Sequence, residues 1–155
     1  MDNATEINVR HARQEDIKKI AETESICFSD PQSEQDVAAE LENGMYTVLV
    51  AETNGRVAGH IIGFCVCDEA EIISLGVDPE KRRRGVAGML LDSFISENRK
   101  NGSVSVFLEV RVSNTPAISL YSSRDFEKIG VRKNFYSNPS EDGYIMKKIL
   151  KGTVE

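Results

Sequence analysis

The chain has 155 residues, a length that favours one domain able to bury its own core. Nineteen Lys and Arg against 25 Asp and Glu leave a formal net charge of −6. Because an acidic surface repels phosphate, the balance argues against general binding to nucleic acid or an anionic membrane. The hydrophobic fraction of 40% with 28% charged residues is typical of a folded globular domain and argues against a disordered chain.

No targeting or membrane segment is predicted. The longest mostly apolar stretch, Val57–Cys67, is short and is interrupted by glycines and a histidine. Met1–Glu6 carries two acidic residues and no apolar core of a secretory signal. We therefore expect a cytoplasmic protein without a membrane partner.

The cysteines and histidines predict neither disulfides nor a metal site. Cys27, Cys65 and Cys67 are odd in number and form no C-x-x-C pair, so we expect reduced thiols. Cys65 and Cys67 are predicted to share one face of a strand as small buried residues. His11 and His60 lie too far apart in sequence to build a recognisable zinc-ligand set, and we expect no metal.

The first half of the chain changes from helical to β periodicity. Alternation predicts a strand over 6–12, and helical spacing predicts a helix over 14–28 whose apolar stripe includes Ile17, Ile20 and Glu24. Ser33 and Asp36 predict a capped second helix that runs to Glu42. Strands are expected over 45–52 and 56–67, joined by the hairpin signal Asn54-Gly55.

The second half reads as alternating strands and helices. Strands are predicted over 70–77, 103–110, 126–134 and 144–150, and helices over 85–99 and 114–124. Asn114 is the expected N-cap of the last helix, with Pro116 in its first turn. A strand–helix–strand unit over 70–110 favours parallel pairing, so the fold class is α/β with a mixed sheet.

A basic loop between a strand and a helix carries the clearest chemical signal. Arg82, Arg83 and Arg84 precede Gly85, Val86, Ala87 and Gly88, where the helix begins. Free N–H groups, the positive end of the helix dipole and small side chains would together suit a pyrophosphate. The loop is neither a Walker A nor a G-x-G-x-x-G sequence. The alternative is a solvated basic turn before an ordinary helix.

The same loop carries a family resemblance. Arg82 to Ala87 resembles the [Q/R]-x-x-G-x-[G/A] signature of the GNAT superfamily of acyl-CoA-dependent N-acyltransferases. Residues 108–121, reading LEVRVSNTPAISLY, are similar to a block of the RimI-type ribosomal-protein-alanine N-acetyltransferases. Residues 132–146 resemble the tail of that group. The resemblance implies a single domain over 1–155 with a mixed, mostly antiparallel sheet of about seven strands flanked by four helices.

Two positions depart from the pattern of the group. Asp125 replaces the glycine of L-Y-x-x-x-G-F, where a positive φ would suit glycine better. After Phe28, the segment that often reads F-S-x-P-W-S-E has Gln32 in place of tryptophan. That segment would sit on the acceptor side, so the change weakens the ribosomal assignment and leaves the acetyl-CoA assignment intact.

The resemblance also implies site residues. Glu109 would act as general base and Tyr121 as general acid. The groups implied to bind acetyl-CoA are the backbone of Leu75, Gly76 and Val77 for the pantetheine arm, the backbone of Arg83, Arg84, Gly85, Val86, Ala87 and Gly88 for the pyrophosphate, and Asn114 near the sulfur.

Elementary chemistry is consistent with these roles. One carboxylate suffices to take the proton of an α-amine, whose pKa of about 8 is well below the value of about 10.4 for lysine. A tyrosine, with an ordinary pKa of about 10, is still protonated when a thiolate departs. Alternatively, Glu109 pairs with Arg111 or lies in water, and Tyr121 is a core residue with a bonded hydroxyl. Phe135 and Tyr136 either line an acceptor channel or only pack.

We therefore expect direct acetyl transfer, in a ternary complex, from acetyl-CoA to a protein N-terminus. The expected acceptor is the N-terminal alanine of a small-subunit ribosomal protein. One alternative is the same fold acting on a small amine or a lysine side chain, and another is a non-catalytic acyl-CoA-binding module. No nucleic-acid partner is expected, and the sequence allows a monomer or a homodimer.

Overall fold

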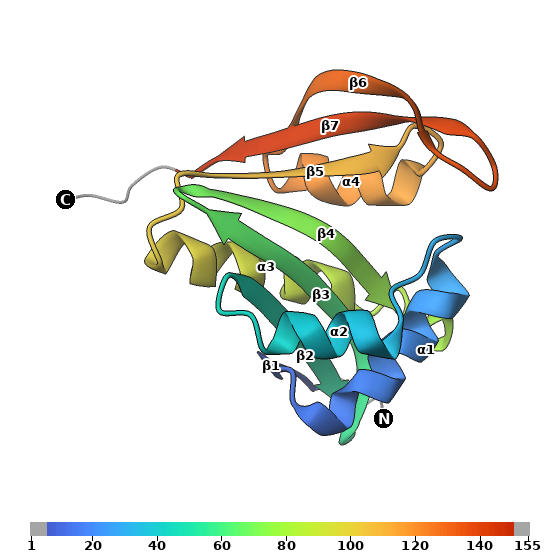
Figure 1. The fold of residues 1–155 in the computed structure, drawn as a ribbon, viewed down its shortest axis with the longest axis vertical. Helices are drawn as coiled ribbons and strands as arrows, with labels where there is room; N and C mark the ends of the chain where they lie inside the picture. Colours follow the sequence, from blue (N-terminus) through green and yellow to red (C-terminus); the bar gives the residue numbers. More distant parts are fainter. Residues whose placement is uncertain (1–5, 151–155) are drawn as a thin grey trace, which may run out of the picture.

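A computed structural model of the chain describes residues 6–150 and shows an open seven-stranded sheet with helices on both faces (Figure 1). The strands are β1 (Ile7–His11), β2 (Tyr46–Thr53), β3 (Arg56–Val66), β4 (Glu69–Val77), β5 (Ser105–Arg111), β6 (Glu127–Tyr136) and β7 (Glu141–Ile149). The helices are α1 (Ile17–Cys27), α2 (Glu34–Leu41), α3 (Val86–Lys100) and α4 (Thr115–Ser123), with short 3₁₀ turns η1 (Gln14–Asp16) and η2 (Pro79–Lys81). The predicted mixed sheet flanked by four helices is confirmed.

The strand order is β1-β2-β3-β4-β5-β7-β6, and every neighbouring pair is antiparallel except β4 with β5. That parallel pair extends from Glu69 opposite Ser105 only as far as Glu71 opposite Phe107. Beyond it the two strands diverge, and the sheet opens between them (Figure 1). The parallel strand–helix–strand unit predicted over 70–110 is therefore present, but its pairing is short.

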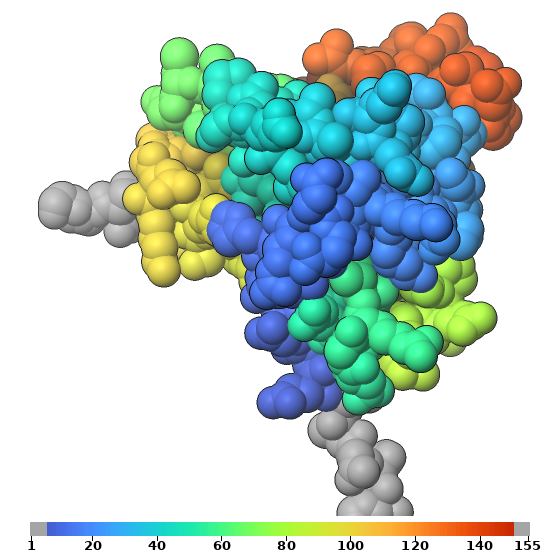
Figure 2. Space-filling model, turned by 60° about the horizontal axis from the view of Figure 1, so that its bottom comes forward, coloured from blue at the N-terminus to red at the C-terminus, as the bar shows by residue number. Residues whose placement is uncertain are grey.

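Each face of the sheet buries its own apolar core. Leu90 and Phe94 of α3 are fully buried in the larger core, to which α4 also contributes. Ile20 of α1 and Val37 of α2 pack with Ile62 of β3 on the opposite face. Figure 2 shows α1 and α2 (blue to cyan) side by side on the surface. Since each such side chain stabilises the fold by about 1.5–3 kcal/mol, both helical layers are held firmly against the sheet.

The caps and turns expected from the sequence are present. Ser33 caps α2 and forms a capping box with Asp36. Asn54 and Gly55 both have positive φ, 53° and 76°, as a tight hairpin turn requires. Asp125, which replaces a family glycine, has φ of 69°. These short-range interactions fix where the elements begin and end.

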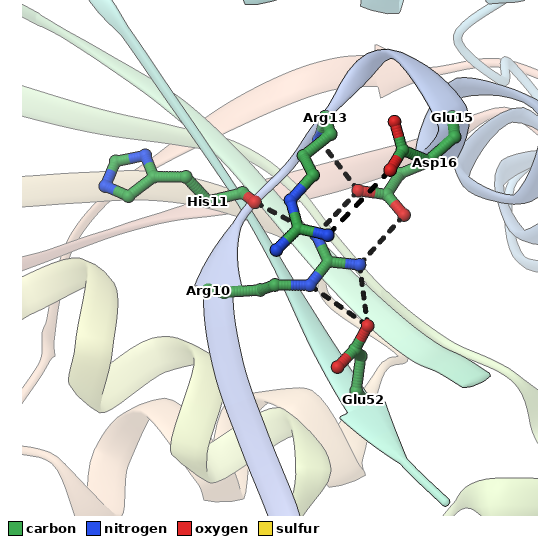
Figure 3. A network of polar contacts seen from close by, with 6 residues as sticks. All are labelled: Arg10, His11, Arg13, Glu15, Asp16 and Glu52. Carbon is green, nitrogen blue, oxygen red and sulfur yellow. Dashed lines mark hydrogen bonds and ion pairs between the residues drawn. The ribbon is translucent and has the colours of Figure 1, made fainter. Parts of the chain in front are cut away.

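The first predicted helix is divided in the structure. The 3₁₀ turn over Gln14–Asp16 precedes α1, and Asp16 is nearly buried there. The Arg10 guanidinium donates to Asp16 at 2.8 Å and to Glu52 at 2.7 Å, as Figure 3 shows. This ion-pair network joins β1 and β2 to the turn that precedes α1.

The prediction for the cysteine pair is wrong at Cys67. Strand β3 ends at Val66, and Cys67 lies exposed in the following turn with φ of 59°. Cys65 stays in the strand, half-buried, with its Sγ 3.1 Å from Ser103 Oγ. The alternation of a strand therefore stops one residue before the second cysteine.

Three further points concern a membrane span, a metal site and a secretory signal, none of which the sequence predicts. No helix within residues 6–150 combines the length and apolar character needed to cross a bilayer. In the same range, no three His, Cys, Asp or Glu side chains are grouped as metal ligands. Residues 1–5, on which the prediction of no secretory signal mainly depends, lie outside the described residues.

Candidate active site

A cavity of about 440 Å³ occupies the opening between β4 and β5. It is lined by Glu24 and Cys27 of α1, residues 28–30 and 32, residues 72–75 of β4, residues 108–111 of β5, Asn114, Ala117 and Tyr121 at α4, and residues 135–137. Since α1 and α4 cover opposite faces of the sheet, the cavity connects the two faces through the split. Two molecules can therefore meet inside it from opposite sides.

The cavity brings together residues that lie far apart in the sequence. Leu75, Glu109, Asn114 and Tyr121 all line it. Gly76 and Val77 continue β4 beyond the cavity, and the basic loop follows at the start of α3. Phe135 and Tyr136 are also lining residues, which favours the acceptor-channel interpretation over simple packing.

The free edge of β4 and the following loop fit an acyl-CoA. Residues 75–77 pair with β3 on one edge, while the pairing with β5 ends at residue 71, so their other edge faces the opening. Within residues 6–150, no group accepts a hydrogen bond from the backbone N–H groups of 83–88. Gly85 has φ of 87°, and an added Cβ there would meet nothing within 4 Å. These free donors at a helix start suit a pyrophosphate.

Gly88 has a different reason to be small. A Cβ at this position would lie 2.4 Å from Arg124 Nη2. Arg124 in turn pairs with Asp92 at 3.1 Å and thereby ties the end of α4 to α3. The expectation that Gly88 is small to let an anion approach is thus incomplete, because the residue also accommodates this arginine.

Tyr121 is nearly buried in the larger core, with its ring 5.6 Å from that of Phe126. Its hydroxyl makes no hydrogen bond to any other residue in the described range, and the residue lines the cavity. The alternative of a core tyrosine with a bonded hydroxyl is therefore not what the structure shows. Burial, with a smaller contribution from Tyr136, raises the pKa of Tyr121 far above its ordinary value.

Glu109 is held in place by Arg132, not by Arg111. Arg132 Nε donates to Glu109 Oε2 at 2.9 Å, and the Glu109 side chain is only 10% exposed. Arg111 instead pairs with Glu141 at 3.1 Å, so the pairing of Glu109 with Arg111 is wrong.

Two neighbouring groups respond to the charge of Glu109. Burial, followed by the nearby Glu109 carboxylate, raises the pKa of Glu71. The same two causes raise the pKa of Tyr136 to about 12. A carboxyl and a phenol that resist ionisation therefore lie beside Glu109.

A buried polar cluster at the α1 side of the cavity was not predicted. Glu24 Oε2 lies 2.7 Å from His60 Nε2 and also accepts from Ser74 Oγ, and Glu24 Oε1 accepts from the backbone of Gln32 at 3.0 Å. Burial raises the pKa of Glu24, but the hydrogen bonds it accepts outweigh this effect and hold its pKa below the ordinary value. The sequence contained one signal, a carboxylate within the apolar stripe of a predicted helix.

Comparisons with known proteins agree with this geometry. The family model described as the acetyltransferase (GNAT) family matches residues 13–126. A Bacillus subtilis protein, provisionally assigned as a ribosomal protein bS18-alanine N-acetyltransferase, is 35% identical over 92% of this chain and 95% of its own length. An N-alpha-acetyltransferase of Saccharolobus solfataricus is 28% identical over 96% of each chain.

A solved structure extends the similarity to the fold. The ribosomal-protein-S18-alanine N-acetyltransferase of Escherichia coli superposes with a TM-score of 0.86 at 30% identity, covering 96% of this chain and 97% of that one. The family match, the relatives and the split sheet all lead to one assignment. The chain belongs to the acetyltransferase (GNAT) family and is an acetyl-CoA-dependent N-acetyltransferase.

Proposed function

We propose that the chain acetylates the N-terminal α-amine of a protein, and that the acceptor is the N-terminal alanine of a small-subunit ribosomal protein. The observation that carries this proposal is the cavity through the split sheet, with Glu109 and Tyr121 on its wall. Acetyl-CoA would lie along β4 and the start of α3, and the acceptor would enter from the α1 side. The two substrates then meet in a ternary complex.

Backbone groups of the chain hold the donor in this proposal. The free edge of residues 75–77 would bind the pantetheine arm as an added strand, and the N–H groups of 83–88 would bind the pyrophosphate. The side-chain oxygen of Asn114 accepts from Ala117 N at 3.2 Å as the cap of α4. The amide nitrogen of Asn114 is left to contact the donor near its sulfur.

The reaction needs one base and one acid. Glu109 takes a proton from the acceptor ammonium, directly or through one water, and the freed amine nitrogen attacks the thioester carbonyl carbon. Backbone N–H groups of residues 75–77 stabilise the oxyanion that forms. The carbon–sulfur bond then breaks, Tyr121 donates its proton to the departing thiolate, and the tyrosinate takes the remaining extra proton from the former amine nitrogen, which leaves a neutral amide and a neutral tyrosine. Because burial raises the pKa of Tyr121, its hydroxyl carries a proton when the thiolate departs.

Two observations support an α-amine as acceptor. An α-amine has a pKa of about 8, against about 10.4 for lysine, so a single carboxylate is an adequate base. The relatives reported above carry the names ribosomal protein bS18-alanine N-acetyltransferase and N-alpha-acetyltransferase. Gln32, which stands where the ribosomal group often has tryptophan, lines the cavity. This difference therefore bears most on which side chain the acceptor carries next to its amine.

The test is intact-mass detection of acetyl transfer in a peptide mixture. One peptide has a free N-terminal Ala-Arg, a second has a free N-terminal Met, and a third is N-blocked with an internal lysine. A gain of one acetyl group on the Ala-Arg peptide alone supports the full proposal. A gain only on the lysine peptide moves the acceptor to a side chain. No gain, with acetyl-CoA still bound, rejects a peptide acceptor and favours a small amine or a binding module.

A further inference from the structure

Arg111, the last residue of β5, reaches the two connections that border the cavity on the α1 side. Its Nη1 donates to the carbonyl of Pro139 at 3.0 Å and to Glu141 Oε1 at 3.1 Å. Its Nη2 donates to Ser29 Oγ and to the carbonyl of Ser137, both at 3.1 Å. One guanidinium therefore joins the α1–α2 connection to the β6–β7 connection.

The same guanidinium also holds an aromatic wall of the cavity. It lies 4.6 Å from the centre of the Tyr136 ring, in the geometry of a cation–π contact. Phe135 meets that ring edge-on at 4.9 Å. Both rings line the cavity. The position of this wall thus depends on where Arg111 holds the β6–β7 connection.

A direct hydrogen bond also joins the two connections. Within residues 6–150, the one other hydrogen bond between them runs from Ser29 Oγ to the carbonyl of Ser137, at 3.2 Å. Figure 2 shows the β6–β7 region (orange) next to the segment that follows α1 (light blue). The two connections come from distant parts of the chain, and the Arg111 guanidinium links them through Ser29 on one side and Ser137, Pro139 and Glu141 on the other.

We propose that Arg111 is a positioning residue for the acceptor: by tying the two connections together it fixes the width of the entrance through which a peptide N-terminus reaches Glu109. This inference rests on the proposed function, since it assigns the α1 side to the acceptor. Arg111 does not contact the reacting atoms in this scheme. Its loss should therefore affect acceptor binding more than the chemical step.

A lysine at this position separates the charge from the geometry. Lysine keeps the positive charge beside Glu141 but cannot present a planar fork to four acceptors at once. If the entrance has the width that admits a peptide only about a tenth of the time once the guanidinium is replaced, the apparent affinity for the acceptor falls about tenfold. Arg111→Lys and Arg111→Ala are accordingly both expected to raise the peptide KM, with alanine giving the larger effect.

Arg10 provides a matched control. Its side chain makes five hydrogen bonds, four to Asp16 and Glu52 and one to the carbonyl of His11, and it is 16% exposed against 22% for Arg111. It joins β1 and β2 to the turn before α1 (Figure 3), and it does not line the cavity. Arg10→Lys should lower thermal stability and leave the peptide KM unchanged.

The experiment measures initial rates against peptide concentration at saturating acetyl-CoA, together with acetyl-CoA binding by calorimetry. We expect Arg111→Lys to raise the peptide KM about tenfold, with kcat within threefold and acetyl-CoA affinity unchanged. A peptide KM within twofold of the unmodified chain, with stability reduced as in Arg10→Lys, would overturn the proposal. A fall in kcat at unchanged KM would overturn it as well.

Amide hydrogen exchange gives a readout that needs no acceptor. In Arg111→Lys, exchange should accelerate in residues 28–33 and 136–140 and stay unchanged around β1 and β2; Arg10→Lys should show the reverse. If the unmodified chain acetylates no peptide, the proposed function fails. The exchange pattern still decides whether Arg111 ties the connections, because unchanged exchange in both segments rejects that role.

Discussion

Replacing Tyr121 by phenylalanine separates the chemistry of the site from its stability. The hydroxyl has no hydrogen-bond partner within residues 6–150, so its removal breaks no bond in the folded chain. The ring that packs against Phe126 is retained. We therefore expect the free energy of unfolding to change by less than about 0.5 kcal/mol. Loss of a general acid typically slows a reaction about 10²–10⁴-fold, which corresponds to about 2.7–5.4 kcal/mol in the activation barrier.

The assay compares kcat for peptide acetylation with acetyl-CoA affinity and the urea midpoint of the same preparation. The expected pattern is a large fall in kcat with affinity and midpoint unchanged. A loss of less than about threefold would remove Tyr121 from its role and point to Tyr136, whose pKa is raised to about 12 and which lines the same cavity. A large loss of stability would show that the hydroxyl has a structural partner and would refute the reasoning.

Three further changes test other parts of the molecule. Gly85→Ala places a Cβ at φ of 87°, which strains the loop conformation by about 1–2 kcal/mol. Because relief of this strain would shift the backbone N–H groups proposed to bind the pyrophosphate, calorimetry should show acetyl-CoA affinity reduced about tenfold at unchanged peptide KM. Burial, with the charges of Asp36 and Glu24, raises the pKa of Glu40 to about 7. The free energy that protonated Glu40 contributes to folding is therefore fully present below about pH 4.3 and is lost as pH rises towards 7. Glu40→Gln should thus raise the urea midpoint at pH 8 but not at pH 4; an equal shift at both would contradict it. Asp125→Gly relieves a φ of 69° and should stabilise by about 1 kcal/mol at most in denaturant unfolding, since glycine also costs unfolded-state entropy.

The parts of the fold that the sequence predicted are those set by short-range interactions. The Ser33 and Asn114 caps each accept from a backbone N–H three residues on, and the Asn54-Gly55 turn needs positive φ at two adjacent residues. Cys67 failed because its positive φ is imposed by the turn between β3 and β4, and a cysteine gives no sign of it. The placement of β7 between β5 and β6 could not be predicted either, since strand order depends on packing.

The site divides in the same way. Glu109 and Tyr121 belong to one contiguous block of sequence, so a motif is enough to place them together. Glu24, His60 and Ser74 come from three different elements and meet only when the sheet forms. Arg132, the partner of Glu109, lies 23 residues away on β6 and had no pattern to connect it. Local motifs thus identify the candidate reactive groups, and tertiary structure decides what holds them.

A single irregularity in β4 accounts for the two-sided character of the cavity. The register with β3 shifts between Ile62 and Gly63, so Ile73 has no partner and the alternation of side chains is reset. As a result Ile72 and Leu75 pack with the larger core under α3, whereas Ser74 turns to the Glu24 cluster under α1. An unbroken strand would send Ile72 and Ser74 to the same face. The bulge therefore gives β4 an apolar side towards α3 and a polar side towards α1 at the point where the sheet opens, and both substrates in the proposed reaction depend on it.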